Sequence, residues 1–221
     1  MSAISIVNPK AEHARSSIAL SVNLSAAKGL QTMLSTNLGP HGTVKMLVSG
    51  AGDLKFTKDG SVLLNEMQLT HPTAVLIARS ATAQDDVTGD GTTSNVLIIG
   101  EVLQKAMISL NEGVHPTIIV NGINAAKKIC LQTLDNMRWR SDGKDFSTPF
   151  LDRSALINVA LTTLKTKLVN NVSNILAQHI VDAVLTVKQP NEPIDLFMIE
   201  IMEIMNRVDT DSKYFYNFQL Y

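Results

Sequence analysis

The stretch Val87-Thr88-Gly89-Asp90-Gly91-Thr92-Thr93-Ser94 joins two segments with helical apolar spacing. Its two glycines allow the backbone to bend where other residues would be strained, and three hydroxyl residues then begin the next helix. The first turn of a helix offers N–H groups without helical partners and the positive end of the helix dipole, which suit a phosphate. Asp90 suits a magnesium ion that accompanies a phosphate. A simple turn and helix cap explains the stretch equally well, since Asp, Ser and Thr are common caps.

Composition and charge exclude several classes of protein. The chain has 221 residues, 45% of them hydrophobic, which is enough for a sizeable core and argues against a largely disordered protein. A net charge of −1 without a basic stripe argues against nucleic acid as the main partner. The single cysteine, Cys130, excludes an internal disulfide and fits a reducing compartment. Without a signal peptide or a bilayer-long apolar run, we expect a cytoplasmic protein with no membrane partner.

Hydrophobic spacing predicts a mainly α chain with one small β-hairpin, an α+β fold class. The hairpin pairs residues 44–48 with 54–57 through a glycine-rich turn. Two long apolar-striped helices, one ending at 111 and one covering 116–137, are expected to pack antiparallel because a short turn joins them. Residues 194–201 are strand-like. Further helices are predicted at 10–33, 61–67, from 72 onward, 153–164 and 172–187.

A polar stretch at 138–149, broken by glycine and proline, indicates a domain boundary. We therefore place a domain boundary near residue 140, before residues 141–205, and treat residues 206–221 separately as an aromatic tail. The tail holds all three tyrosines, and such a segment favours aggregation unless a partner covers it.

Three polar turns stand where regular elements end or begin: 38–42, 58–60 and 89–94. If they meet in space, their N–H groups and carboxylates could hold a nucleotide and a metal ion. No Walker A pattern is present, so an ATP site would be of another type. The five histidines lack metal-ligand spacing, and no serine lies in a nucleophile elbow.

An ordered set of short motifs resembles the N-terminal part of group II chaperonin subunits. The motifs are Asn37-Leu-Gly-Pro-x-Gly, Thr57-Lys-Asp-Gly, His71-Pro-Thr, Gln84-Asp-Asp and Gly89-Asp-Gly-Thr-Thr-Ser. Within that family, the stretches from Lys45, Ser94 and Pro193 are similar to zeta-type subunits of the eukaryotic cytosolic chaperonin, TRiC/CCT. The resemblance extends from about Val7 to about Met205.

This resemblance implies that residues 1–140 are the N-terminal half of an equatorial, ATP-binding domain. Residues 141–205 would be a linker and the first half of an intermediate domain. The implied cofactors are ATP or ADP and Mg²⁺, with Asp90 as the metal ligand and Asp59 as an accessory carboxylate beside the γ-phosphate. For Lys167, a solvated lysine at a helix end is an equally good interpretation. The implied nucleotide-binding residues are Leu38, Gly39, Pro40, Gly60, Gly91, Thr92, Thr93, Ser94, Thr162, Thr163 and Lys167.

The implied function is that of an ATP-dependent chaperone subunit, which works with other chaperonin subunits in a hetero-oligomeric double ring on unfolded client proteins. The chain departs from the family pattern in two respects. His41 stands where the family usually has lysine, and a full subunit is more than twice as long. The catalytic carboxylate lies in the part beyond this chain, so we expect weak nucleotide binding and negligible turnover. A non-enzymatic helical interaction protein, or an inactive truncated fragment, is the alternative.

Overall fold

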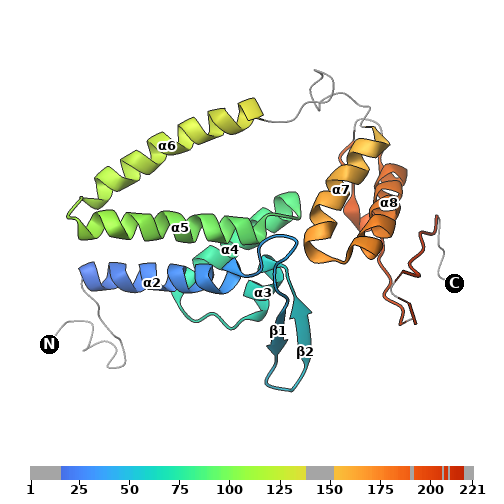
Figure 1. Cartoon of the computed structure of the whole chain (residues 1–221), viewed down its shortest axis with the longest axis horizontal. Helices are drawn as coiled ribbons and strands as arrows, with labels where there is room; N and C mark the ends of the chain where they lie inside the picture. The colour runs from blue at the N-terminus through green and yellow to red at the C-terminus, as the bar shows by residue number, and fades with distance from the viewer. Residues whose placement is uncertain (1–15, 138–151, 190–191, 206, 209, 217–221) are drawn as a thin grey trace. The chain divides into compact units, whose positions relative to one another are not determined.

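The computed structural model describes residues 16–137, 152–189, 192–205, 207–208 and 210–216 (Figure 1). The start of the first predicted helix, the 138–149 linker and the end of the aromatic tail lie outside these residues. The chain forms two compact units. One consists of residues 1–38 and 42–137, and the other of residues 39–41 and 138–221. Each unit is described by itself.

The first unit contains five described helices and a two-stranded antiparallel hairpin, as the sequence predicts. Local signals set most boundaries: Asp59 caps α3 through two backbone N–H groups, Pro72 occupies the first turn of α4, and Gly113 follows α5 with φ 89°. The elements are α2 (Ser16–Ser35), β1 (Lys45–Val48), β2 (Leu54–Thr57), α3 (Gly60–Glu66), α4 (Pro72–Thr88), α5 (Thr92–Asn111) and α6 (Pro116–Met137).

The core of this unit forms where α2, α3, α4 and α5 pack together. Leu34, Leu63 and Val96 are almost completely buried there. Gly100 marks the closest crossing of α2 and α5, because a Cβ at that position would lie 2.5 Å from the Cβ of Gln31. Gln31 also donates a 2.8 Å hydrogen bond from Nε2 to Oε2 of Glu101. These contacts fix the position of α5, whose first turn carries the hydroxyl residues.

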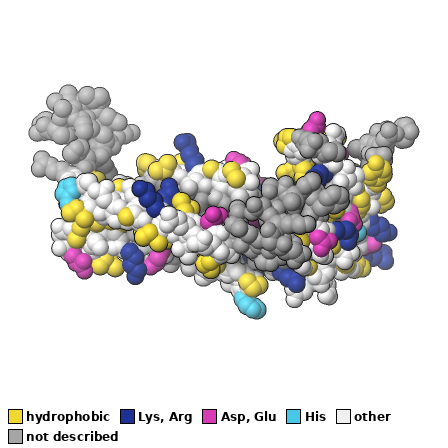
Figure 2. All heavy atoms as spheres, turned by 90° about the horizontal axis from the view of Figure 1, so that it is seen from above, with side chains coloured by type: hydrophobic (Ala, Val, Ile, Leu, Met, Phe, Trp, Pro, Cys, Tyr) yellow, Lys and Arg dark blue, Asp and Glu magenta, His cyan; other side chains and the backbone are white. Residues whose placement is uncertain are grey.

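The predicted antiparallel packing of α5 and α6 is wrong. No residue of α6 is buried, and the helix diverges from α5 after the connecting turn (Figure 1). Ile129 and Leu134 are 65% and 62% exposed. Figure 2 shows hydrophobic side chains at the molecular surface, interspersed with charged ones. The apolar periodicity predicted a buried face on α6, but periodicity does not say whether another surface covers that face.

The second unit contains a helix pair, α7 (Arg153–Lys167) and α8 (Asn170–Val187). Arg153 forms a bidentate pair with Asp182, with Nε to Oδ1 at 2.8 Å and Nη2 to Oδ2 at 2.9 Å. Hydrogen bonds and charge from Arg153 lower the pKa of Asp182 below its ordinary value, and the charge of His179 acts in the same direction. This pair ties the start of α7 to the last third of α8.

The strand predicted at 194–201 is not formed. Residues Leu196–Met198 make a single 3-10 turn, in which Oδ1 of Asp195 accepts a 3.0 Å hydrogen bond from the N–H of Phe197. The prediction rested on an imperfect alternation of apolar and polar residues, but a strand also needs a neighbour for its backbone groups. Among the described residues, the only sheet is the pair β1–β2.

Among the helices of the described residues, none combines the length and apolarity that a bilayer crossing requires.

Candidate functional site

The turn between α4 and α5 has the backbone conformation that the sequence predicts. Gly89 ends α4 with φ 64°, and Gly91 precedes α5 with φ 80°, a left-handed conformation that favours glycine at both positions. Thr92 is the first residue of α5, and Gly91 supplies no side-chain cap. The N–H groups of Thr92, Thr93 and Ser94 therefore begin the helix without a capping side chain, as an anion-binding helix end requires.

A second predicted turn, Lys58-Asp59-Gly60, lies directly against this one. A Cβ on Gly60 would be 2.8 Å from Oγ1 of Thr93 and 3.0 Å from its backbone nitrogen, so only glycine fits without a shift. The hydroxyl of buried Thr92 donates to Oδ1 of Asp59 at 3.4 Å. The first turns of α3 and α5 are thus in contact, and the positive ends of both helix dipoles lie close together.

Asp59 has a structural role that the sequence analysis did not assign. Its Oδ2 accepts hydrogen bonds from the N–H groups of Ser61 and Val62, both at 3.1 Å, while Oδ1 faces Thr92. One carboxylate therefore caps α3 and also links it to α5. The accessory catalytic role of Asp59 stays a prediction.

Two further residues, Gln84 and Thr88, contact the turn and were missed as site residues. The hydroxyl of Thr88 lies 2.8 Å from the carbonyl oxygen of Asp90, and Nε2 of Gln84 lies 2.9 Å from Oγ1 of Thr88. Their spacing of four residues places both side chains on one face of α4. That spacing, immediately before a Gly-Asp-Gly turn, is the sequence signal that could have identified them.

Asn37 is a third residue that the sequence analysis did not single out. It is 5% exposed and directly precedes the predicted binding loop Leu38-Gly39-Pro40. Its Nδ2 is the one buried side-chain polar atom of the described residues without a hydrogen-bond partner. A buried amide of this kind is costly unless something accepts its hydrogens.

The remaining predicted residues lie in the loop at 38–40 and on α7. Gly39 has φ 79°, a conformation that requires glycine or a strained residue. Thr162, Thr163 and Lys167 lie on the C-terminal half of α7, and the hydroxyl of Thr162 donates to the carbonyl of Asn158 at 2.8 Å. The approach of Leu38, Gly39, Pro40 and the α7 residues to the turn at 89–94 stays a prediction.

The donor set fits a magnesium ion that arrives with phosphate better than a metal bound by protein alone. Among the described residues, no group of three or more His, Cys, Asp or Glu side chains could hold a metal ion. Mg²⁺ is commonly held by one or two carboxylates, with phosphate oxygens and water as its other ligands. Asp90, next to the uncapped first turn of α5, would offer a hard oxygen ligand beside N–H groups of the kind that a phosphate needs.

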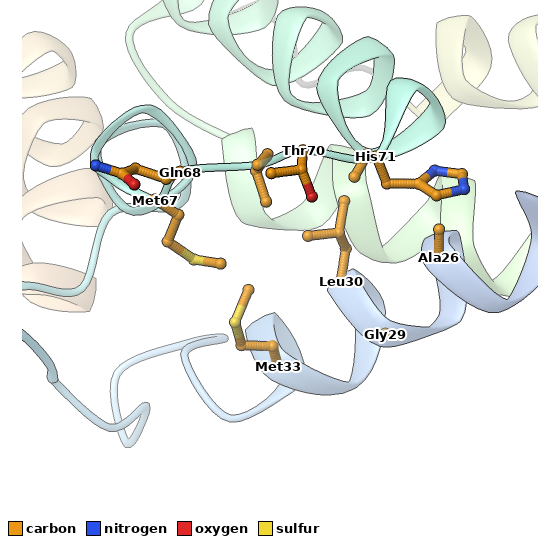
Figure 3. A pocket seen from close by; sticks show the side chains of 10 residues that line it. Ala26, Gly29, Leu30, Met33, Met67, Gln68, Thr70 and His71 are labelled. Atoms are coloured by element: carbon orange, nitrogen blue, oxygen red, sulfur yellow. The ribbon is translucent and has the colours of Figure 1, made fainter. Parts of the chain in front are cut away.

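An open pocket of about 330 Å³ lies elsewhere in the first unit, between α2 and the segment before α4 (Figure 3). Its lining is largely apolar and includes Leu30, Met33 and Met67, with His71 at one end. No residue of the turn at 89–94 lines it. The pocket shares no lining residue with that turn, so it is separate from the candidate site.

Comparison with known proteins decides the family. The profile of the TCP-1/cpn60 chaperonin family matches residues 30–219, which is most of the chain. The chain belongs to this family. It is 55% identical over 213 residues to T-complex protein 1 subunit zeta-2 of Homo sapiens and 52% identical over the same length to that of Mus musculus. Each alignment covers 96% of this chain and 39% of the relative.

Membership of the chaperonin family confirms the resemblance drawn from the short motifs. The mainly α structure with one hairpin also agrees with the predicted fold class. The chain spans about two fifths of the length of these relatives, so the residue roles in this chain rest on the geometry above.

Proposed function

We propose that the first unit carries part of an ATP site. Thr92, Thr93 and Ser94 bind nucleotide phosphates through the first turn of α5, and Asp90 binds the accompanying Mg²⁺. The observation that carries this proposal is the contact between the first turns of α3 and α5, with Gly60 against Thr93 and Asp59 against Thr92. This contact fixes the position of the uncapped first turn of α5, whose N–H groups and dipole attract an anion.

The same proposal assigns supporting roles to the other predicted residues. Gly39, Gly60 and Gly91 allow a close approach of backbone to phosphate, and Leu38 and Pro40 shape the adjoining loop. Thr162, Thr163 and Lys167 contribute hydroxyl groups and a positive charge from α7. Asp59 adds a carboxylate near the γ-phosphate while it also caps α3.

We infer that the chain acts as part of an ATP-dependent chaperone subunit in the cytoplasm. Its partners are the other chaperonin subunits of a hetero-oligomeric ring, and unfolded proteins are the clients of that assembly. Family membership and the identity to zeta-2 subunits across 96% of the chain support this inference.

Binding of Mg·ADP to the full 221-residue chain, measured by calorimetry, tests the ATP site. We expect Asp90→Asn to weaken binding by at least about tenfold, because it replaces a charged oxygen ligand with a neutral amide. Asp86→Asn is the matched control, since Asp86 is an exposed carboxylate on the last turns of α4. Equal affinities of wild type and Asp90→Asn for Mg·ADP would falsify the magnesium assignment.

A second candidate function, a non-enzymatic helical interaction protein, is favoured by the exposed apolar face of α6. Co-purification with ring subunits discriminates between the two. Association that survives Asp90→Ala supports the interaction protein, whereas association that requires nucleotide supports the ATP site.

A further inference from the structure

The turn that carries Asp90 is held by a chain of side-chain hydrogen bonds from α4. Nε2 of Gln84 donates to Oγ1 of Thr88 at 2.9 Å, and the Thr88 hydroxyl lies 2.8 Å from the carbonyl oxygen of Asp90. Nε2 of Gln84 also lies 3.5 Å from that carbonyl. Both donors belong to the last two turns of one helix, a rigid element that packs against α5.

We propose that Gln84 and Thr88 are positioning residues that fix the Asp90–Gly91 peptide for phosphate and magnesium binding. This inference rests on the proposed ATP site and assigns to two residues outside the predicted site the task of preorganising it. Neither side chain needs to touch the ligand.

The turn needs such a device because its own residues do not define its conformation. Gly89 and Gly91 flank Asp90, and glycine has more backbone freedom to lose on ordering than any other residue. Each occupies a left-handed conformation, with φ 64° and φ 80°. Gly89 is exposed and Asp90 is only partly buried, so surrounding packing does not restrict this peptide strongly.

The hydrogen bonds reach the carbonyl oxygen of Asp90, which sets the direction of the next N–H group. A trans peptide is planar, so its carbonyl and the following N–H point in opposite directions. When Thr88 holds the carbonyl of Asp90 on the α4 side, the N–H of Gly91 is directed away from α4. The same bond limits rotation about the Asp90 backbone and thus the range of positions open to its carboxylate.

Gln84 also orients the hydroxyl that makes the contact. The Thr88 oxygen accepts from Gln84, so its own hydrogen is available to an acceptor, either the Asp90 carbonyl or the Gln84 carbonyl at 2.9 Å. The amide of Gln84 lies over Gly91 as well, since a Cβ on Gly91 would be 3.7 Å from Nε2. That distance is an ordinary van der Waals contact, so a Cβ would fit at position 91. Glycine is favoured there because of the left-handed φ of 80°.

Three substitutions test the role of the Thr88 hydroxyl in the full-length chain. Thr88→Val removes the hydroxyl and keeps the shape, whereas Thr88→Ser keeps the hydroxyl. Thr133→Val is the matched control, because Oγ1 of Thr133 also bonds the carbonyl four residues before it, Ile129, but lies on α6. Gln84→Glu, which loses the amide donor at neutral pH, tests the second link.

The two readouts are the affinity for Mg·ADP and the backbone NMR order parameters of residues 90–92. We expect Thr88→Val to weaken binding by about three- to tenfold, the loss of roughly one hydrogen bond, and to lower these order parameters. Gln84→Glu should act in the same direction. Thr88→Ser should remain within about twofold of wild type, and Thr133→Val should change neither readout. A purely structural cap would instead lower the unfolding free energy and leave affinity unchanged.

Wild-type order parameters in Thr88→Val overturn the inference, whether or not nucleotide binds. Lower order parameters with unchanged Mg·ADP affinity also overturn it, since the turn would then not need to be held for binding. A wild-type chain that does not bind Mg·ADP overturns the proposed ATP site instead, and the order parameters still decide whether Gln84 and Thr88 hold the turn.

Discussion

Substitution of Gly100 by alanine should destabilise the first unit, although alanine is the better helix former. The added Cβ would lie 2.5 Å from Cβ of Gln31 and 2.9 Å from its Cγ. Carbon atoms in favourable contact are about 3.5–4.0 Å apart, so α2 and α5 must separate by roughly 1 Å at their crossing. Such overpacking costs about 1–3 kcal/mol, and the gain in helix propensity offsets about 0.8–1.0 kcal/mol of it.

Gly29 provides the matched control on the same pair of helices. It lies inside α2, and a Cβ added there meets nothing within 4 Å. Gly29→Ala should therefore stabilise the chain by up to about 1 kcal/mol. Because both variants share the propensity gain, the difference between them isolates the crowding at Gly100 and should be about 1–3 kcal/mol. Urea unfolding followed by far-UV circular dichroism measures it, and a Gly100→Ala variant as stable as Gly29→Ala would refute the close crossing.

Four other substitutions address the site, the core, the exposed face of α6 and the second unit. Gly60→Ala should reduce Mg·ADP affinity, because its Cβ would displace Thr93 at the start of α5. Amide exchange in α7 should stay as in the wild type. Unchanged affinity contradicts the proposed contact between helix ends. Leu34→Ala, at a fully buried position, should cost about 2–5 kcal/mol in unfolding free energy, whereas Leu134→Ala on α6, 62% exposed, should cost under about 0.5 kcal/mol. Equal losses for these two leucines would show that α6 is covered in solution. Hydrogen bonds from Arg153 lower the pKa of Asp182 in the folded chain. The pair therefore stabilises the α7–α8 contact at pH values above the ordinary aspartate pKa. This stabilisation is lost as the pH falls through the lower pKa of the folded state. Protection of the α7 and α8 amides, taken relative to the intrinsic exchange rate at each pH, should fall below about pH 4, and Asp182→Asn should abolish that fall.

Much of the local structure could be predicted from the sequence because its causes are local. Asp59, Pro72 and Gly113 mark helix ends through capping, a fixed φ and a left-handed conformation, and each of these effects acts within a few residues. The Gly-Asp-Gly turn followed by hydroxyl residues predicts an uncapped helix start for the same reason.

The two wrong predictions concern segments whose conformation or packing depends on a second element. Residues 194–201 have the composition of a strand, yet they lack a described neighbour to pair with and form only a 3-10 turn. The stripe on α6 has the correct helical period, yet α5 does not cover it. Composition and periodicity describe what a segment can bury or pair, and not whether a partner is present.

The sequence by itself determined the helices, the hairpin, the hydroxyl-rich start of α5 and, through its ordered motifs, the chaperonin family. Only the tertiary structure decided that Gly60 touches Thr93 and that Asp59 links α3 to α5. The first group follows from interactions between residues close in the chain. The second depends on how α3, α4 and α5 pack, because contacts between residues up to 33 positions apart are set by the shape of the shared core.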